Sequence, residues 1–219
     1  MHILLWGLTA QAIPNSYTQL LAHYVDGHGR VDYESWGSDP LYKKLMQDLL
    51  NYPKPTNDTA YWINVYNALT IHTVLEHYPV QSIRDIADGA VWSTKKFSLA
   101  SGTYTLDDIE HKILRPKKDP RVHAALNCAS IGCPPLWNKP FVEDNIDTQL
   151  SQAMERWLDH NAYRKNSGTI QISKIFSWYA EDFTPNPIEY LRTLRPKEKW
   201  PSWEQAQFIP YDWSLNKAP

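Results

Sequence analysis

The chain lacks two features that would point to a membrane or to nucleic acid. No apolar run approaches the ~18 residues of a membrane-spanning helix, and there is no block of basic residues. Its 22 Lys and Arg and 24 Asp and Glu residues are interspersed and leave a formal net charge of −2. We therefore expect neither an integral membrane span nor a nucleic-acid partner.

The chain is also poor in glycine, with eight residues, and its sixteen prolines are scattered. The sequence contains no flexible linker, low-complexity tract or internal repeat. A chain of 219 residues, 42% of them hydrophobic, buries roughly 70% of its unfolded surface and needs no crosslink to fold. We predict a single globular domain over residues 13–219.

The first twelve residues have only part of the pattern of an export signal. Ile3–Leu8 is apolar, and Ala10-Gln11-Ala12 fits the small-x-small pattern of a signal-peptidase site. The apolar run is short, and no Lys or Arg precedes it. We interpret residues 1–12 as a signal-peptide remnant and predict a periplasmic or secreted protein. The alternative is a cytoplasmic protein in which these residues begin a buried helix or strand.

The longest helical pattern runs from Asp58 to Tyr78, and Pro79 ends it. Its apolar residues surround the helix axis instead of forming one stripe, which is typical of a central, buried helix. Asn64 and Asn67 interrupt this pattern, and buried amides must find hydrogen-bond partners. We interpret them as links from this helix to the backbone of a neighbouring loop. The alternative is that they bind a substrate carbonyl.

Shorter patterns surround this helix. Helices are predicted at Ser16–Val25, Leu41–Leu50, Ser82–Ala87, Leu106–Leu114, Asp144–Asn161 and Pro187–Leu194. Extended segments are predicted at Arg30–Tyr33, Lys95–Leu99, Thr103–Thr105, Thr169–Ser173 and Phe208–Trp213. Because helices and strands are mixed without a βαβ rhythm, we predict an α+β fold in which helices and a small, mostly antiparallel sheet surround the central helix.

The segment Asp119–Leu136 carries the residues best suited to chemistry. His123 and Cys128 point in different directions whether the segment is a strand or a helix, so a Cys128 nucleophile needs a base from elsewhere unless the chain bends between them. Pro134-Pro135 excludes a helix that starts directly after Cys133, which removes one way of activating a thiol. His111 is the best remaining partner, because it lies on the predicted helix Leu106–Leu114 together with two acidic residues.

Cys128 and Cys133 have three interpretations. They form a disulfide, which closes a small loop and contributes only roughly 2 kcal/mol, or they are free thiols with a role, or they are inert. A disulfide is typical of an exported protein and makes both sulfurs unavailable as nucleophiles. The sequence has no HxxxH pair and no CxxC motif, so we predict neither a metal site nor a cofactor.

Five motifs in this order resemble a widespread family that is catalogued only as domain of unknown function 547: Trp62–Ala68, Thr105–His111, Asp119–Leu136, Ser173–Tyr179 with Asp182-Phe183, and Tyr211–Asn216. The family occurs in bacteria, often exported, and in plants, where it is fused to leucine-zipper segments. This chain has no such zipper. The family has no agreed activity, so the resemblance implies no catalytic residue. Its motif positions correspond here to Asn64, Asn67, Glu110, His111, Arg121, His123, Asn127, Cys128, Cys133, Lys174 and Asp182.

From these residues we predict a thiol-dependent hydrolase or acyltransferase that acts on a peptide or amide. The predicted catalytic residues are Cys128 as nucleophile, His111 or His123 as base, Glu110 as orienting acid and Asn127 or Asn64 as oxyanion donor. The predicted substrate-binding residues are Asn64, Asn67, Arg121 and Lys174. The alternative is a non-catalytic binding or interaction module of the cell envelope, with a Cys128–Cys133 disulfide and aromatic residues that contact a peptide or glycan.

Overall fold

The computed structural model describes residues 13–52, 58–166 and 168–219. The predicted signal-peptide remnant, residues 1–12, lies outside the described residues. No helix within the described ranges is both long enough and apolar enough to cross a membrane.

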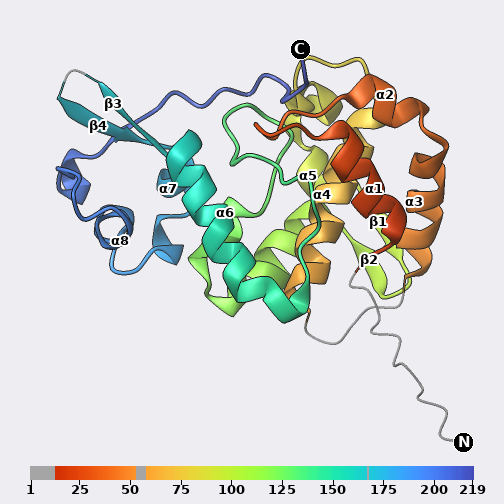
Figure 1. The fold of residues 1–219 in the computed structure, drawn as a ribbon, viewed down its shortest axis with the longest axis horizontal. Helices are drawn as coiled ribbons and strands as arrows, with labels where there is room; N and C mark the ends of the chain where they lie inside the picture. The colour runs from red at the N-terminus through yellow and green to blue at the C-terminus, as the bar shows by residue number, and fades with distance from the viewer. Residues whose placement is uncertain (1–12, 53–57, 167) are drawn as a thin grey trace, which may run out of the picture.

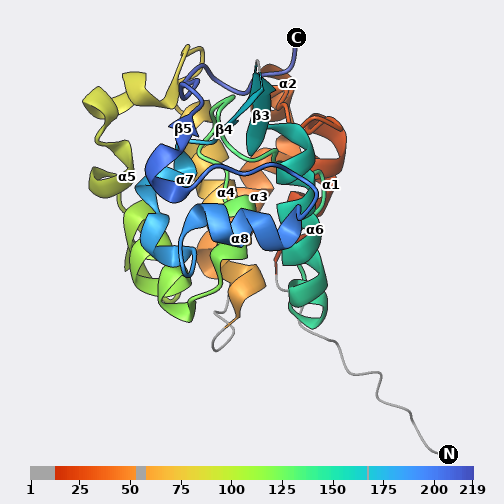
Figure 2. The same cartoon turned by 90° about the vertical axis from the view of Figure 1, so that its left-hand side faces the viewer.

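Helix α4 (Thr59–Leu75) runs through the middle of the molecule, and the other elements surround it (Figures 1 and 2). It begins at Asp58, whose carboxylate accepts a hydrogen bond of 2.7 Å from the backbone N–H of Tyr61. Every residue from Ala60 to Ile71 is buried. The prediction of a central, buried helix is therefore confirmed, because a helix that is apolar all round finds packing partners on all sides.

Three helices and a hairpin from the N-terminal half build one end of the molecule. Helices α1 (Asn15–Tyr24), α2 (Tyr33–Ser38) and α3 (Pro40–Asn51) lie beside the hairpin of β1 (Phe97–Leu99) and β2 (Gly102–Tyr104), as Figure 1 shows. Helix α2 was not predicted, because its six residues are too few to show a helical period. It buries Trp36 completely, and Asp32 caps it by accepting from Ser35 N.

Short helical turns line the middle of the molecule. They are η1 (Ile83–Gly89), α5 (Val91–Thr94), the π-helix η2 (Asp108–Leu114), and the 3₁₀ turns η3 (Arg115–Lys117) and η4 (Pro120–Ala124). Turn η4 lies at the start of Asp119–Leu136, the segment with the predicted catalytic cysteine, which we call the cysteine segment. The directions of the His123 and Cys128 side chains were compared for a strand and for an α-helix, but the cysteine segment forms neither.

The opposite end contains helices α6 (Ile146–His160), α7 (Ile175–Trp178) and α8 (Pro187–Leu194), with the short turns η5 (Glu143–Asn145), η6 (Ala180–Asp182) and η7 (Trp203–Gln205). Its sheet has the order β3 (Tyr163–Asn166), β4 (Thr169–Ile172) and β5 (Gln207–Phe208). Strands β3 and β4 are antiparallel, with Tyr163 opposite Ile172, and β4 and β5 are parallel. The α+β class is confirmed. Strand β3, whose middle residues are charged, was not predicted.

After β5 the chain crosses the molecule and ends beside α2 (Figure 1). Lys217 forms a β-bridge with Val31, and Leu215 forms one with Ser130 in the cysteine segment. Asn216 accepts a hydrogen bond of 2.7 Å from the Tyr33 hydroxyl. The C-terminal tail therefore connects the N-terminal helices to the cysteine segment.

Two amides fix α4 to its neighbours. Asn64 donates to the carbonyl of Phe141 at 2.8 Å and accepts from the same residue's N–H at 2.9 Å. Asn67 donates to the carbonyl of Ala125 and accepts from the N–H of Asn127, both at 2.9 Å. Both amides therefore form hydrogen bonds with backbone groups of neighbouring loops, which is the first of the two interpretations given above.

We expect Asn67→Ala to lower the free energy of unfolding by about 3 kcal/mol, because it leaves a buried N–H and a buried C=O without partners. Urea unfolding measures this loss. Asn51→Ala is the matched control, because the Asn51 amide is exposed and donates to the carbonyl of Gln47 on its own helix. An Asn67→Ala protein as stable as the control would contradict this role.

Asp58 lies beside Glu143, which accepts from the N–H of Ala60 at 2.9 Å. Burial, and then the proximity of Glu143, raises the pKa of Asp58 to about 6. A carboxyl whose pKa is raised on folding holds a proton that the unfolded chain releases. Stability is therefore lost as the pH rises from the unfolded value of about 3.9 through the folded pKa.

Asp58→Asn should remove this loss while keeping the cap, because the Asn side-chain oxygen also accepts from Tyr61 N. We expect the unfolding free energy of the variant to fall less than that of the wild type over this pH window. Urea unfolding at several pH values measures both slopes. If the unfolding free energy of both proteins changes equally with pH, Asp58 is not the group that causes the loss of stability.

Candidate functional site

A cavity of about 270 Å³ lies between α4, α5, η2, α7 and the C-terminal tail. Six of the fifteen residues that line it are Tyr or Trp, and a smaller group is acidic or basic. Its lining consists of Tyr66, Gly89, Trp92, Ser93, Asp107, Glu110, His123, Leu126, Cys128, Cys133, Ile175, Trp178, Tyr179, Tyr211 and Trp213. Three of these residues belong to the predicted catalytic set, namely Glu110, His123 and Cys128.

Cys128 and Cys133 form a disulfide, with their Cα atoms 6.3 Å apart, and we call residues 128–133 the disulfide loop. The backbone turns tightly here, because Ala129 has a φ of 61°. Gly132 is required by a close approach: a Cβ at this position would lie 2.9 Å from the ring of Tyr211. The loop therefore presents its two sulfurs to the cavity and its glycine to a tyrosine.

The hydroxyl of Tyr211 lies at the centre of the disulfide loop. It is 3.2 Å from Cys128 Sγ, 3.1 Å from Cys133 Sγ and 3.0 Å from Ser130 Oγ. Burial raises the pKa of Tyr211, so the phenol is neutral at pH 7. The C-terminal tail therefore supplies the polar group that contacts both sulfurs.

His123 is paired with Asp182, which follows α7. Its Nε2 lies 2.7 Å from Asp182 Oδ2, and Arg115 holds both oxygens of the same carboxylate at 2.7 and 3.0 Å. Burial favours a higher pKa for Asp182, but the bonds from Arg115 and His123 outweigh it and lower the pKa. The carboxylate thus fixes the orientation of the imidazole.

The imidazole itself is neutral at pH 7. Its side chain is only 2% exposed, and burial lowers the pKa of His123 although Asp182 and Glu110 act to raise it. The neutral ring donates through Nε2 to Asp182, so Nδ1 is an acceptor. Among the described residues, none forms a hydrogen bond with Nδ1. The cavity therefore has one basic nitrogen that is free to accept a proton.

Glu110 supplies a buried carboxylate to the same cavity. It is only 7% exposed. Burial and then the charge of Glu110 raise the pKa of Tyr66 and of Tyr179. The same charge acts to raise the pKa of His123 and of Tyr211. Its negative charge therefore acts on four other side chains of the lining.

The open side of the cavity is aromatic. The ring of Trp178 lies 4.8 Å from that of Tyr211 and 5.7 Å from that of Trp213, and Trp92 lies 6.0 Å from Trp213. Trp178 is 46% exposed, which is unusual for so large an apolar side chain. An exposed tryptophan at the edge of a concave site is typical of a binding surface.

His111 lies outside the lining, although the sequence favoured it as the base. Its Nδ1 lies 2.9 Å from Arg115 Nη1, its Nε2 lies 4.0 Å from Asp107 Oδ1, and its side chain is 40% exposed. His123 and Cys128 both line the cavity, because the chain bends between them. The bend includes Asn127, whose amide donates to Pro134 O and accepts from Ala129 N.

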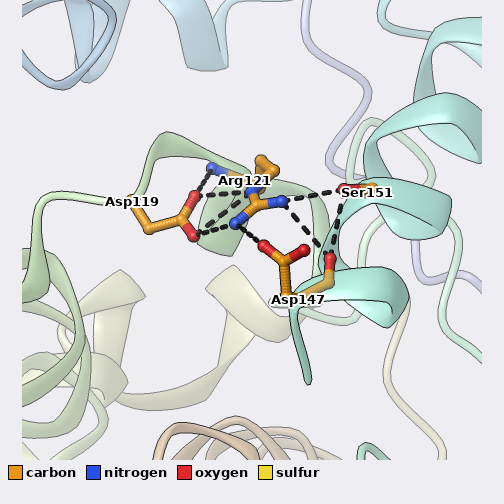
Figure 3. A network of polar contacts seen from close by, with 4 residues as sticks. All are labelled: Asp119, Arg121, Asp147 and Ser151. Carbon is orange, nitrogen blue, oxygen red and sulfur yellow. Dashed lines mark hydrogen bonds and ion pairs between the residues drawn. The ribbon is translucent and has the colours of Figure 1, made fainter. Parts of the chain in front are cut away.

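The predicted substrate-binding residues also lie away from the cavity. Asn64 and Asn67 are occupied by backbone groups, as described above. Arg121 binds Asp119 at 2.6 Å, Asp147 at 2.8 Å and Ser151 at 2.8 Å, and so connects η4 to α6 (Figure 3). Lys174 lies 4.9 Å from the centre of the Phe208 ring and lines a separate depression next to β5.

The sequence did not identify the role of Tyr211, Trp178 or Asp182 in this site. All three lie in the motifs that carry the family resemblance, which was the only available signal. Within the described residues, no group of three or more His, Cys, Asp or Glu side chains lies close enough together to hold a metal ion.

Comparisons with known proteins add one finding. No curated protein and no solved structure matches this chain. A family model matches residues 51–158, which contain α4, η2, the disulfide loop and most of α6. That family is described as "Protein of unknown function, DUF547", and through these residues the chain carries a domain of this uncharacterised family.

Proposed function

We propose that this protein is a binding module whose cavity holds a small organic group, with the Cys128–Cys133 disulfide as a fixed part of the wall. The observation that carries the proposal is the cavity itself. It is concave, six of its fifteen lining residues are Tyr or Trp, and the carboxylates of Asp107 and Glu110 and the imidazole of His123 line it as well. Such a combination is typical of small-molecule sites.

The disulfide supports binding over thiol catalysis. Both cysteines of the chain are in this bond, and a sulfur in a disulfide is not a nucleophile. The bond also keeps the backbone turn that places Gly132 against Tyr211. A stable disulfide is typical of oxidising compartments, which supports our proposal of a periplasmic or secreted protein.

The size of the cavity limits the ligand. A volume of about 270 Å³ is at the lower end of the roughly 300–1,000 Å³ of drug-sized sites. It therefore admits one sugar ring or one amino-acid side chain. Peptides, amides and glycans remain the proposed ligand classes, with only one terminal group of the ligand inside the cavity.

Filling the cavity should abolish binding. Ser93 is exposed and lines the cavity, so we expect Ser93→Trp to place an indole there. Wild type and variant are screened against a panel of cell-wall peptides, glycans and amides by thermal shift and tryptophan fluorescence. We expect ligands that raise the melting temperature of the wild type and leave that of the variant unchanged.

The matched control is Ser98→Trp, because Ser98 is equally exposed but lies on β1, outside the lining. It should bind as the wild type does. Ligands that bind Ser93→Trp and the wild type equally would show that the cavity is not the site. A wild type that binds none of the panel would contradict the proposed function.

A second candidate is the predicted thiol hydrolase or acyltransferase, in a form that a dithiol has reduced. One observation favours it: the pair Asp182–His123, with Nδ1 of the imidazole free, lines the same cavity as Cys128. After reduction, His123 would take the proton of Cys128, and the thiolate would attack an amide carbonyl. The C–N bond breaks, the amine leaves with that proton, and water or an amine then cleaves the thioester.

Alkylation separates the two candidates. In the binding module, iodoacetamide should label neither cysteine of the untreated protein, and mass spectrometry should find the Cys128–Cys133 bond. After treatment with a dithiol, the thiol candidate requires Cys128 to be labelled faster at pH 6 to 7 in the wild type than in His123→Asn, because loss of the base raises the thiol pKa. His160→Asn is the control, because His160 lies outside this cavity. Equal labelling rates would remove the thiol candidate.

A further inference from the structure

The cavity contains negative groups without a positive partner inside it. Asp107 and Glu110 line it, and none of its described lining residues is Lys or Arg. His123 does not neutralise them, because its burial keeps the ring uncharged at pH 7. The nearby guanidinium of Arg115 is already neutralised by Asp182 and Glu181. A cavity of this kind attracts positive charge.

The carboxylate of Glu110 is well placed to act on a ligand. It is nearly buried, so water screens its charge less than that of a surface carboxylate. Its charge already acts on Tyr66, Tyr179, Tyr211 and His123, which surround the cavity. All of these groups are neutral at pH 7, so none of them cancels the charge.

The aromatic rings of the lining favour the same sign of charge. The face of an aromatic ring is electron-rich and attracts cations, most strongly in tryptophan. Two of these rings already have a guanidinium close by: Arg115 lies 5.1 Å from the centre of Tyr179, and Arg84 lies 5.1 Å from the centre of Trp213. Neither arginine lines the cavity. The rings of Trp92 and Trp178 line it and have no such guanidinium among the described contacts, so they are available to a ligand.

We propose that the group held in this cavity is a small organic ammonium, such as an alkylated or primary amine at the end of a larger ligand. Its charge would face Glu110 and Asp107, and its alkyl groups would contact Trp178, Tyr179 and Tyr211. The inference rests on the proposed binding function and adds the chemical class of the ligand. A neutral sugar or amide brings no positive charge to balance the two carboxylates, and an anion is repelled by them.

Three probes with the same shape and different charge test the sign. They are choline, the neutral 3,3-dimethylbutan-1-ol and the anionic 3,3-dimethylbutanoate. Titration calorimetry and tryptophan fluorescence measure binding at pH 7. We expect choline to bind at least about tenfold more tightly than the neutral alcohol, because the alcohol lacks the cation–π contacts and the attraction to the two carboxylates, and we expect the anion to bind least.

Variants of the cavity test which groups provide the preference. Glu110→Gln keeps the size of the side chain and removes its charge, so choline and the neutral alcohol should then bind with similar affinity. Glu189→Gln is the control, because Glu189 lies on α8, outside the lining.

Should circular dichroism show that Glu110→Gln does not fold, Trp178→Leu replaces it, because Trp178 is half-exposed. We expect Trp178→Leu to weaken choline binding at least threefold, and Trp203→Leu, outside the cavity, to leave it unchanged.

The outcomes separate this inference from the proposed function. Equal or tighter binding of the neutral alcohol or the anion would overturn the cationic ligand and leave a binding cavity in place. A preference for choline that survives in both Glu110→Gln and Trp178→Leu would also overturn it, because the charge would then be recognised elsewhere. Absence of binding by all three probes would overturn the inference. The proposed function would fall with it only if the broader ligand panel also gave no binding.

Discussion

The amide of Asn67 connects the buried core of the protein with the wall of the cavity. It lies on the central helix α4, and it pairs with backbone groups of Ala125 and Asn127 directly before the disulfide loop. Asn127 continues the connection, because its own amide holds the carbonyl of Pro134 and the N–H of Ala129. The position of both sulfurs therefore depends on a buried amide of the central helix.

A second set of contacts completes the cavity from the other end of the chain. The tail brings Tyr211 to the sulfurs and Trp213 to the aromatic side of the cavity. Asn216 fixes this tail by bonding to Tyr33, to Gly29 and to Asn127. The same asparagine thus contacts both the N-terminal helices and the segment before the disulfide loop.

The sequence predicted the elements whose pattern is local. Helix α4 was predictable because its apolar residues lie all around the helix axis, and Asn64 and Asn67 were predictable as links because a buried amide must be paired. The class of the fold followed from the order of helices and strands. The match of residues 51–158 to the DUF547 model agrees with three of the five motifs that suggested the family.

The arrangement of the site was not predictable in the same way. Periodicity describes strands and helices, whereas His123 and Cys128 lie in a 3₁₀ turn and in the bend that follows it, so the direction of each side chain could not be derived. Tyr211 and Asp182 reach the cavity across 83 and 59 positions of the chain, from Cys128 and His123 respectively. Such contacts leave no mark in a local pattern. The choice between a disulfide and two thiols also depends on the distance between two backbone positions, which a sequence does not contain.

The crossing of the C-terminal tail also determines when the cavity can form during synthesis. A ribosome makes the chain from the N-terminus at roughly 5–20 residues per second, so the buried helix and both cysteines emerge long before Tyr211 and Trp213. Until these last residues arrive, the sulfurs lack the phenol that contacts them and Trp178 lacks two of its ring partners. The nascent chain therefore contains the residues of its central helix first and those that complete the cavity last.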